Sequence, residues 1–329
     1  MRACLLGQVM LPGAPIGAGG RILVIRGGAI GDFILTLPAI RLLRENFRDS
    51  QIEILGYPSI AQLALHWELA DRVAALEHGA LARFFVPGAE LVERWSAYFS
   101  SFEVVISYLF DPDDYFHGNL RRAGVRLLLI GPHKPLDDGG PAALQLAKPL
   151  ADLGLFLRED QARQPFVAAR EPQEPGKTIA LHPGSGSPEK NWGPEQWRVV
   201  CRDLATDTGA NFLIISGEAE HETIREFTAA LESDTLSYEP LHSRPLPEVA
   251  ERLAGCGVFV GHDSGISHLA AACGLPCVLL FGPTNPKVWA PLQSQVEIIA
   301  APGRRVSEIS SGEVLDRVRA VMRGLRPEA

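Results

Sequence analysis

Three short segments of the sequence combine glycine with polar side chains, and each follows an apolar run that predicts a buried strand. They are Gly27–Asp32, His182–Trp192 and Gly261–His268. An open α/β sheet binds its ligand beyond the carboxyl ends of its strands, which is where these segments are expected. Glycine allows close backbone approach, and backbone amides, hydroxyl groups and a cation together bind phosphate. The residue types therefore predict a site for an anionic, phosphate-bearing ligand.

The segment after the second of these strands carries the clearest phosphate chemistry. Ser185 and Ser187 supply hydroxyl groups in a Gly/Ser loop, and Lys190 supplies a cation. The third segment opens a helix at Asp263 and Ser264, where amide groups and the helix dipole favour an anion. Plain structural interpretations stay open, because these residues could cap helices and the loop could be a solvated surface turn.

Two further motifs keep rival chemistries open. Arg26–Gly31 approximates a dinucleotide fingerprint, although Arg26 replaces its first glycine, and Glu53 stands where a ribose-binding acid is sought. Asp111–Asp114 contains a DxD element that would bind a divalent ion, but an Asp-Pro turn that caps the preceding strand is preferred. Histidine and cysteine show no zinc-ligand spacing, so no metal is expected.

The composition limits the class of protein. With 329 residues, of which 46% are hydrophobic, the chain is long enough for two domains. A net charge of −8 argues against a nucleic-acid partner. The five cysteines are odd in number and lack CxxC spacing, which indicates reduced thiols and a cytoplasmic protein. No apolar run approaches the roughly 20 residues of a membrane helix.

Alternating strands and helices predict two α/β domains with parallel sheets. The predicted strands are 21–26, 51–57, 102–110, 125–130, 178–182, 211–216, 257–261 and 276–282. The predicted helices are 32–47, which Pro38 should kink or shorten, then 91–100, 193–209, 218–232, 246–255, 266–274 and 313–325. The expected organisation is a flexible leader at 1–20, a first domain at 21–162, a proline-rich linker at 163–177 and a second domain at 178–329.

The sequence resembles glycosyltransferase family 9, the heptosyltransferases of bacterial lipopolysaccharide synthesis. Three stretches carry the resemblance in the family's order: RILVIRGGAIGDFILTLPAIRLLRENF, IALHPGSGSPEKNWGPEQW and GHDSGISHLAAACGLPCVLLFGPTNPKVWAP. The resemblance implies a GT-B fold, two Rossmann-like domains facing each other across a cleft. It also implies inverting transfer of a sugar, usually from ADP-heptose, to a lipopolysaccharide-core or other glycan acceptor, with no metal or other cofactor required. The first domain would bind the acceptor and the second the nucleotide sugar.

The same resemblance assigns roles to residues at matching positions. Asp32 falls at the catalytic base, and Lys190 at the residue that binds the donor diphosphate. Gly28 and Gly31 allow close backbone approach beside Asp32. The other donor-binding positions are Ser185, Ser187, Glu220 toward the nucleoside, Asp263, Ser264, Gly265 and His268.

Three alternatives remain open at this point: a NAD-dependent oxidoreductase, a sugar-nucleotide epimerase and a non-catalytic sugar-nucleotide-binding protein. A lipid-linked acceptor would bring the enzyme into transient contact with the inner face of the cytoplasmic membrane. The candidate contact residues are aromatic or basic: Phe84, Phe85, Trp95, Arg121 and Arg122. For any one of the aromatic residues, a place in the core is the favoured alternative.

Overall fold

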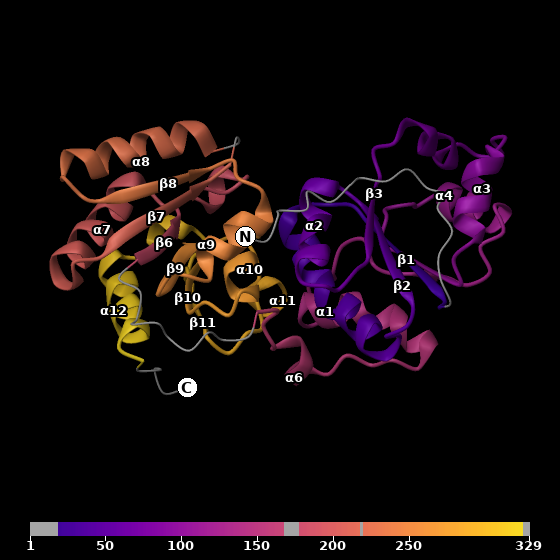
Figure 1. Ribbon diagram of the computed structural model, residues 1–329. Coiled ribbons are helices and arrows are strands. Elements are labelled where there is room, and N and C mark those ends of the chain that lie inside the picture. The colour runs from indigo at the N-terminus through magenta and orange to yellow at the C-terminus, as the bar shows by residue number, and fades with distance from the viewer. Residues whose placement is uncertain (1–18, 168–177, 218–219, 325–329) are drawn as a thin grey trace, which may run out of the picture. The chain divides into compact units, whose positions relative to one another are not determined.

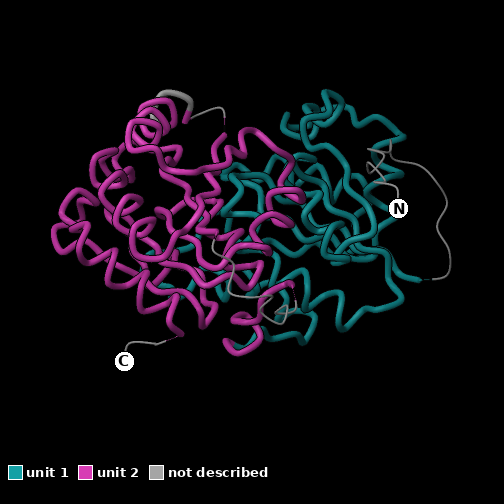
Figure 2. The backbone as a smooth tube through the Cα atoms, turned by 60° about the vertical axis from the view of Figure 1, so that its left-hand side comes forward, with its two compact units in different colours: residues 1–158 teal, residues 159–329 magenta. Residues whose placement is uncertain are grey.

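The computed structural model describes residues 19–167, 178–217 and 220–324. By its internal contacts the chain divides into two compact units, Met1–Arg158 and Glu159–Ala329 (Figure 2). The division falls four residues before 162, the expected end of the first domain. Arg163 Nη1 donates to the Leu292 carbonyl and the Phe166 N–H donates to the Ala272 carbonyl, which ties this segment to the second unit. The proposed leader up to residue 18, and the linker from 168 onward, lie outside the described residues.

The first unit is built on a parallel sheet whose strand order is β3-β2-β1-β4-β5 (Figure 1). Its strands are β1 (Arg21–Arg26), β2 (Gln51–Gly56), β3 (Arg72–Ala75), β4 (Val104–Ser107) and β5 (Leu128–Ile130). Its helices are α1 (Ile30–Asn46), α2 (Pro58–His66), α3 (Glu93–Ser100), α4 (Tyr115–Arg122) and α5 (Ala142–Ala147), with 3₁₀ turns at Gly79–Phe85 and Lys148–Leu153. The strand order reverses between β1 and β4, because the chain adds β2 and β3 on one side of β1 and β4 and β5 on the other. An open α/β sheet binds its ligand at such a reversal.

The expected shortening of the first helix at Pro38 was wrong. α1 runs for 17 residues through this proline. Proline removes one helical hydrogen bond and crowds the preceding turn. Here most residues from Phe33 to Leu43 are buried and α1 packs against α5, so packing stabilises the helix across that defect.

The core of the first unit includes two of the residues expected to contact a membrane. Phe84 is 1% exposed and Trp95 is 5% exposed, and both pack among aromatic side chains. Phe85 is partly exposed, and its ring stacks on Phe116 at 4.6 Å between centroids. Phe84 and Trp95 are therefore not membrane contacts, and the alternative that they are core residues is correct for both.

The second unit has a six-stranded parallel sheet in the order β11-β10-β9-β6-β7-β8. Its strands are β6 (Thr178–His182), β7 (Asn211–Ser216), β8 (Tyr238–His242), β9 (Val258–His262), β10 (Cys277–Phe281) and β11 (Val296–Ala300). Its helices are α6 (Glu159–Ala162), α7 (Pro194–Thr208), α8 (His221–Ser233), α9 (Leu246–Leu253), α10 (Gly265–Ala272), α11 (Pro286–Trp289) and α12 (Ser311–Met322), with 3₁₀ turns at Pro188–Lys190 and Val306–Glu308. This is the Rossmann strand order. The chain adds its strands toward one edge from β6 and then toward the other edge from β9, so the strand order reverses between β6 and β9.

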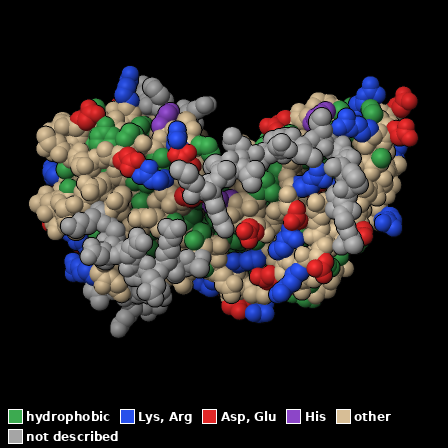
Figure 3. All heavy atoms as spheres, in the orientation of Figure 1, with side chains coloured by type: hydrophobic (Ala, Val, Ile, Leu, Met, Phe, Trp, Pro, Cys, Tyr) green, Lys and Arg blue, Asp and Glu red, His purple; other side chains and the backbone are tan. Residues whose placement is uncertain are grey.

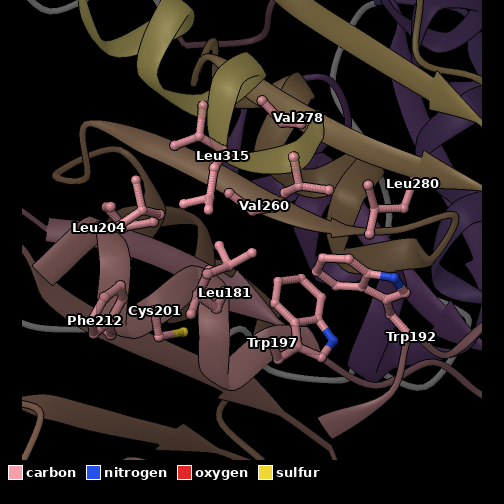
Figure 4. Packing of buried hydrophobic residues seen from close by; sticks show 14 of the residues in the cluster. Leu181, Trp192, Trp197, Cys201, Leu204, Phe212, Val260, Val278, Leu280 and Leu315 are labelled. Carbon is pink, nitrogen blue, oxygen red and sulfur yellow. The ribbon is translucent and has the colours of Figure 1, made fainter. Parts of the chain in front are cut away.

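Two tryptophans anchor the core of the second unit (Figure 4). Trp192 and Trp197 are each 1% exposed, and their rings meet edge to face with centroids 5.2 Å apart. The Trp192 indole N–H donates to the Ile309 carbonyl at 3.0 Å. Because Trp192 ends the polar loop after β6, this packing fixes the far end of that loop.

Three remaining expectations concern cysteines, membrane spans and the alternation of elements. Cys201, Cys256, Cys273 and Cys277, in the described part of the chain, are free thiols. Within the described ranges, no helix has the length and apolar character needed to cross a membrane. The predicted α/β class with parallel sheets is confirmed in both units.

Candidate functional site

Two of the three polar segments lie side by side in the second unit, at the point where the strand order reverses. β6 and β9 are neighbours, and His182 at the end of β6 pairs with Gly261. The loop after β6 and the turn after β9 therefore leave the sheet at the same edge. This is the position at which α/β sheets bind nucleotides.

An ion pair at this edge joins Lys190 to Asp263. Lys190 Nζ lies 2.7 Å from Asp263 Oδ2, although the residues are 73 positions apart. Thr284, which follows β10, donates its hydroxyl to the same oxygen at 2.6 Å. The Asp263 side chain is 8% exposed and that of Lys190 26% exposed. The carboxylate thus holds the ammonium group at the rim, where an anion can still reach it.

Thr284 was not predicted as a site residue from the sequence. It lies within a stretch that carries the family resemblance, but no separate motif marked it. Only the fold shows that the turn after β10 reaches the carboxylate that follows β9. The strand order of a Rossmann-like domain could have pointed to Thr284, because β10 lies next to β9 and its carboxyl end is at the same edge of the sheet.

The two loop serines differ in what they contact. The Ser185 hydroxyl is buried, 2.7 Å from Asn191 Oδ1 and 2.8 Å from the Ser187 carbonyl oxygen. It therefore ties the loop to itself in this structure. Ser187 is half-buried, and its N–H donates to Ser185 Oγ at 3.3 Å.

The start of α10 supplies the helix N-terminus that the sequence predicted. Ser264 is its N-cap, and its hydroxyl oxygen accepts from the Ser267 N–H at 3.4 Å. Gly265 is the first residue of α10, and His268 lies one turn further on, 5% exposed. The plain capping interpretation of Ser264 is thus correct. It does not compete with anion binding, because the first amides of any helix lack intrahelical acceptors.

Glu220 is also brought to this edge, from the end of β7. Its Oε2 accepts from the Gly217 N–H at 2.6 Å, and its Oε1 lies 3.9 Å from His182 Nε2. Gly184 in the neighbouring loop is needed for this approach, since a side chain there would place its Cβ 2.4 Å from the Glu220 Cγ. Glu220 and Lys190 therefore belong to loops that leave one sheet edge.

In the first unit, Asp32 stands in the first turn of α1, beyond β1. Its Oδ2 accepts from the Ala29 N–H at 3.0 Å, and its side chain is 31% exposed. Gly28 adopts a φ of +96°, and a Cβ there would lie 2.8 Å from Asp32 Oδ2. Gly31 lies beside Asp32 in the same turn. Asp32 caps the helix and still presents part of its carboxylate to solvent.

A buried cation, Arg26, supports the Asp32 turn. Its guanidinium Nη2 donates to the Asp32 carbonyl at 3.2 Å and lies 3.7 Å from Asp32 Oδ1. Nη1 donates to the His133 carbonyl at 3.0 Å. Burial lowers the pKa of Arg26, and the nearby Asp32 opposes that shift. Arg26 thus fills the position that a dinucleotide fingerprint reserves for glycine.

Glu53 does not sit where a ribose-binding acid belongs. It pairs with Leu23 across the sheet, away from the carboxyl end of β1 at Arg26. Its carboxylate is buried, accepting from the Tyr98 hydroxyl at 2.7 Å and from Arg21 at 3.2 Å. Burial and the neighbouring Glu53 raise the pKa of Tyr98. The dinucleotide motif therefore lacks its acid.

The DxD run forms a turn, as the preferred interpretation predicted, but Asp111 caps the following helix α4 and not the preceding strand. The Asp111 carboxylate accepts from the Phe116 and His117 N–H groups at 3.2 and 2.8 Å. His117 bridges Asp111 at 3.1 Å and the Ser107 hydroxyl at 2.9 Å, while Asp114 pairs with Arg121 at 2.7 Å. Asp111, Asp114 and His117 have ligand atoms within 4.8 Å of one another, but each is already engaged in these contacts.

Comparison with known proteins decides the family. The model of glycosyltransferase family 9 (heptosyltransferase) matches residues 143–317. The chain belongs to glycosyltransferase family 9. The matched region contains Lys190, Asp263 and Thr284, so the polar edge of the second unit lies within the family's shared sequence.

Relatives of this family 9 member differ in how much of their length they share with it. Lipopolysaccharide heptosyltransferase 1 of Escherichia coli O18:K1:H7 is 30% identical over 143 residues, 44% of this chain and 43% of the relative. Lipopolysaccharide heptosyltransferase 1 of Salmonella typhimurium is 24% identical over 332 residues, 91% of this chain and 99% of the relative. An Escherichia coli heptosyltransferase solved with ADP superposes with a TM-score of 0.71 at 18% identity, covering 92% of this chain and 99% of the solved one. The family 9 fold is thus shared along nearly the whole chain.

Proposed function

We propose that this family 9 member is an inverting glycosyltransferase that moves a heptose, or a related sugar, from a nucleoside-diphosphate donor to a glycan acceptor. The donor is ADP-heptose, and the acceptor is the core of lipopolysaccharide or a similar glycan. The observation that carries the proposal is the Lys190–Asp263 pair beside the first turn of α10, at the strand-order reversal of the second unit. An ammonium group and free helix amides at one sheet edge suit a diphosphate.

The second unit would bind the donor and stabilise the leaving group. Negative charge builds on the diphosphate as its bond to the anomeric carbon breaks. Lys190 and the amides at Gly265 are positioned to stabilise that charge. Because Asp263, itself bonded to Thr284, already holds Lys190 at the rim, little reorganisation is needed when the donor binds. Glu220, at the end of the adjacent β7, is the proposed contact for the nucleoside.

The first unit would bind the acceptor and supply the base. Asp32 takes the proton of the acceptor hydroxyl as that oxygen attacks the anomeric carbon, and the diphosphate leaves with the electron pair of the broken bond. This single displacement inverts the anomeric centre. The proposal includes the GT-B fold, in which one Rossmann-like domain binds the acceptor and the other binds the donor.

A nucleotide titration tests this function against its main rival. We expect calorimetry to show binding of ADP and no binding of NAD, because Glu53 is buried against Tyr98 and Arg21 and cannot reach a ribose. Incubation with ADP-heptose and a core acceptor should then yield a product enlarged by one heptose. NAD binding without ADP binding would favour the oxidoreductase. ADP binding without transfer to any glycan would favour a non-catalytic binding protein.

Transfer activity is expected to survive EDTA. The described group with ligand spacing, Asp111, Asp114 and His117, is occupied by capping and ion-pair contacts, and Lys190 supplies positive charge for the diphosphate. The assay compares initial rates with and without EDTA and with added Mg²⁺ or Mn²⁺. If transfer strictly requires a divalent ion, and if Asp114→Ala abolishes that ion-dependent transfer, the diphosphate binds at that cluster and not at Lys190.

Contact with a membrane surface is the remaining part of the proposal. The exposed apolar side chains of the first unit are candidates in place of Phe84 and Trp95; they include Phe110, Leu136 and Phe156, which are 65%, 64% and 70% exposed. Arg121 and Arg122 are bonded to Asp114 and Asn119, and basic and acidic side chains intermingle on the face shown in Figure 3.

We therefore expect weak, salt-sensitive binding to anionic liposomes. A single basic side chain near an anionic surface contributes about 1 kcal/mol, and salt screens that attraction. Co-sedimentation at low and high salt, with and without lipid-linked acceptor, measures it. Tight binding that resists salt would contradict the proposal, and no binding even with acceptor would indicate a soluble acceptor.

A further inference from the structure

Two buried histidines end the neighbouring strands β6 and β9, and the proposed reaction uses neither of them. His182 is 3% exposed and His262 is fully buried. Burial lowers the pKa of His182 to about 4 and that of His262 to about 3. Both rings are therefore neutral near pH 7. A neutral imidazole has one nitrogen that donates a hydrogen bond and one that accepts, so the partners of each ring decide which nitrogen does which.

His262 accepts through Nε2. The backbone N–H of Trp192 lies 2.8 Å from this nitrogen, and an amide N–H can only donate. The ring proton is consequently on Nδ1. Trp192 comes two residues after Lys190, and its indole is fixed in the core. The bond to His262 therefore fixes the end of the loop that carries Lys190.

His182 accepts through the opposite nitrogen, Nδ1. Its Nε2 faces the Glu220 carboxylate at 3.9 Å, which favours a proton on Nε2. Nδ1 lies 3.1 Å from Ser264 Oγ and is left to accept the hydroxyl proton. The Ser264 oxygen can still accept from the Ser267 N–H and cap α10. His182 therefore fixes the turn at which α10 begins.

We propose that His182 and His262 are positioning residues of the donor site, which hold its two phosphate-binding parts through opposite ring nitrogens. His262 positions the Lys190 loop, and His182 positions Ser264 and the first amides of α10. The inference rests on the proposed function. Neither ring contacts the substrate. Each acts through its partner, and a site of this kind loses efficiency when supporting contacts allow shifts of about an ångström.

Asparagine and glutamine distinguish the two nitrogens. The side-chain oxygen of asparagine reaches about as far as Nδ1 of histidine, and that of glutamine about as far as Nε2. At position 182 asparagine should therefore replace the acceptor and glutamine should not. At position 262 the order should reverse. We expect His182→Asn and His262→Gln to bind ADP within about threefold of the wild type, and His182→Gln and His262→Asn to bind it about tenfold more weakly.

A second measurement follows the hydrogen bonds themselves, without a ligand. Hydrogen exchange of the Trp192 amide should accelerate in His262→Asn and stay slow in His262→Gln, while both His182 variants leave it unchanged. Thermal unfolding of all four variants confirms that a folded protein is being compared. The exchange readout applies even to a variant whose ADP binding is too weak to titrate.

The outcomes separate this inference from the proposed function. If asparagine and glutamine rank in the same order at both positions, the rings only fill space and the inference fails. Unchanged Trp192 exchange in His262→Asn would overturn the role of His262 in the same way. If wild-type protein does not bind ADP at all, the proposed function fails, and the exchange pattern still tests the contact between His262 and the loop.

Discussion

Replacement of Asp32 by asparagine is expected to abolish sugar transfer and to leave ADP affinity within a few-fold of the wild type. The carboxylate is the proposed acceptor of the hydroxyl proton, and loss of a general base costs about 10²–10⁴ in rate. The asparagine side-chain oxygen can still accept from the Ala29 N–H, which Asp32 Oδ2 now does at 3.0 Å. The start of α1 is therefore preserved, and the loss of activity would report on the proton transfer.

Glu93→Gln provides a matched control for this prediction. Glu93 is an exposed acid in the first turn of α3, in the same unit, and has no proposed role in transfer. Steady-state transfer rates and ADP calorimetry on both variants make the comparison. Near-normal turnover in Asp32→Asn, with folding intact, would remove Asp32 from the mechanism and leave only its capping role.

How far the sequence predicts this fold depends on where each strand lies in its sheet. β1, β6 and β7 are central or next to central and mostly buried, and their continuous apolar runs were predicted with the observed bounds. Three of the four edge strands, β3, β8 and β11, were not predicted, and the fourth, β5, was predicted with three residues too many at its start. β8 is mostly exposed and contains Pro240, so neither hydrophobic alternation nor composition marked it.

The candidate site was predictable to the level of loops but not of contacts. Lys190, Asp263 and Ser264 were predicted to lie near one another because they follow strand ends in glycine-rich turns. The loops that follow parallel strands lie at the same edge of the sheet. Which side chains meet across that edge depends on strand order. The Thr284 contact to Asp263 and the inward turn of Ser185 could therefore be seen only after folding.

Lys190→Ala is expected to weaken ADP binding by about 10- to 100-fold and also to lower kcat. A charge-assisted hydrogen bond to phosphate contributes about 1.5–3 kcal/mol, and the charge on the leaving diphosphate grows in the transition state. The same substitution removes the cation that pairs with Asp263, whose side chain is 8% exposed. Thr284 is then the remaining described side-chain donor to this carboxylate. A buried carboxylate without its cation destabilises the fold, so this variant should also unfold at a lower temperature.

A double variant separates these two effects. Lys190→Ala combined with Asp263→Asn removes the unpaired charge, so the unfolding temperature should recover while ADP affinity stays low. Lys148→Ala, which removes an exposed lysine of the first unit, controls for a general loss of positive charge. If the double variant regains both stability and ADP affinity, Lys190 acts only as the partner of Asp263. If Lys190→Ala binds ADP as tightly as the wild type, the loop is structural and the diphosphate must bind elsewhere.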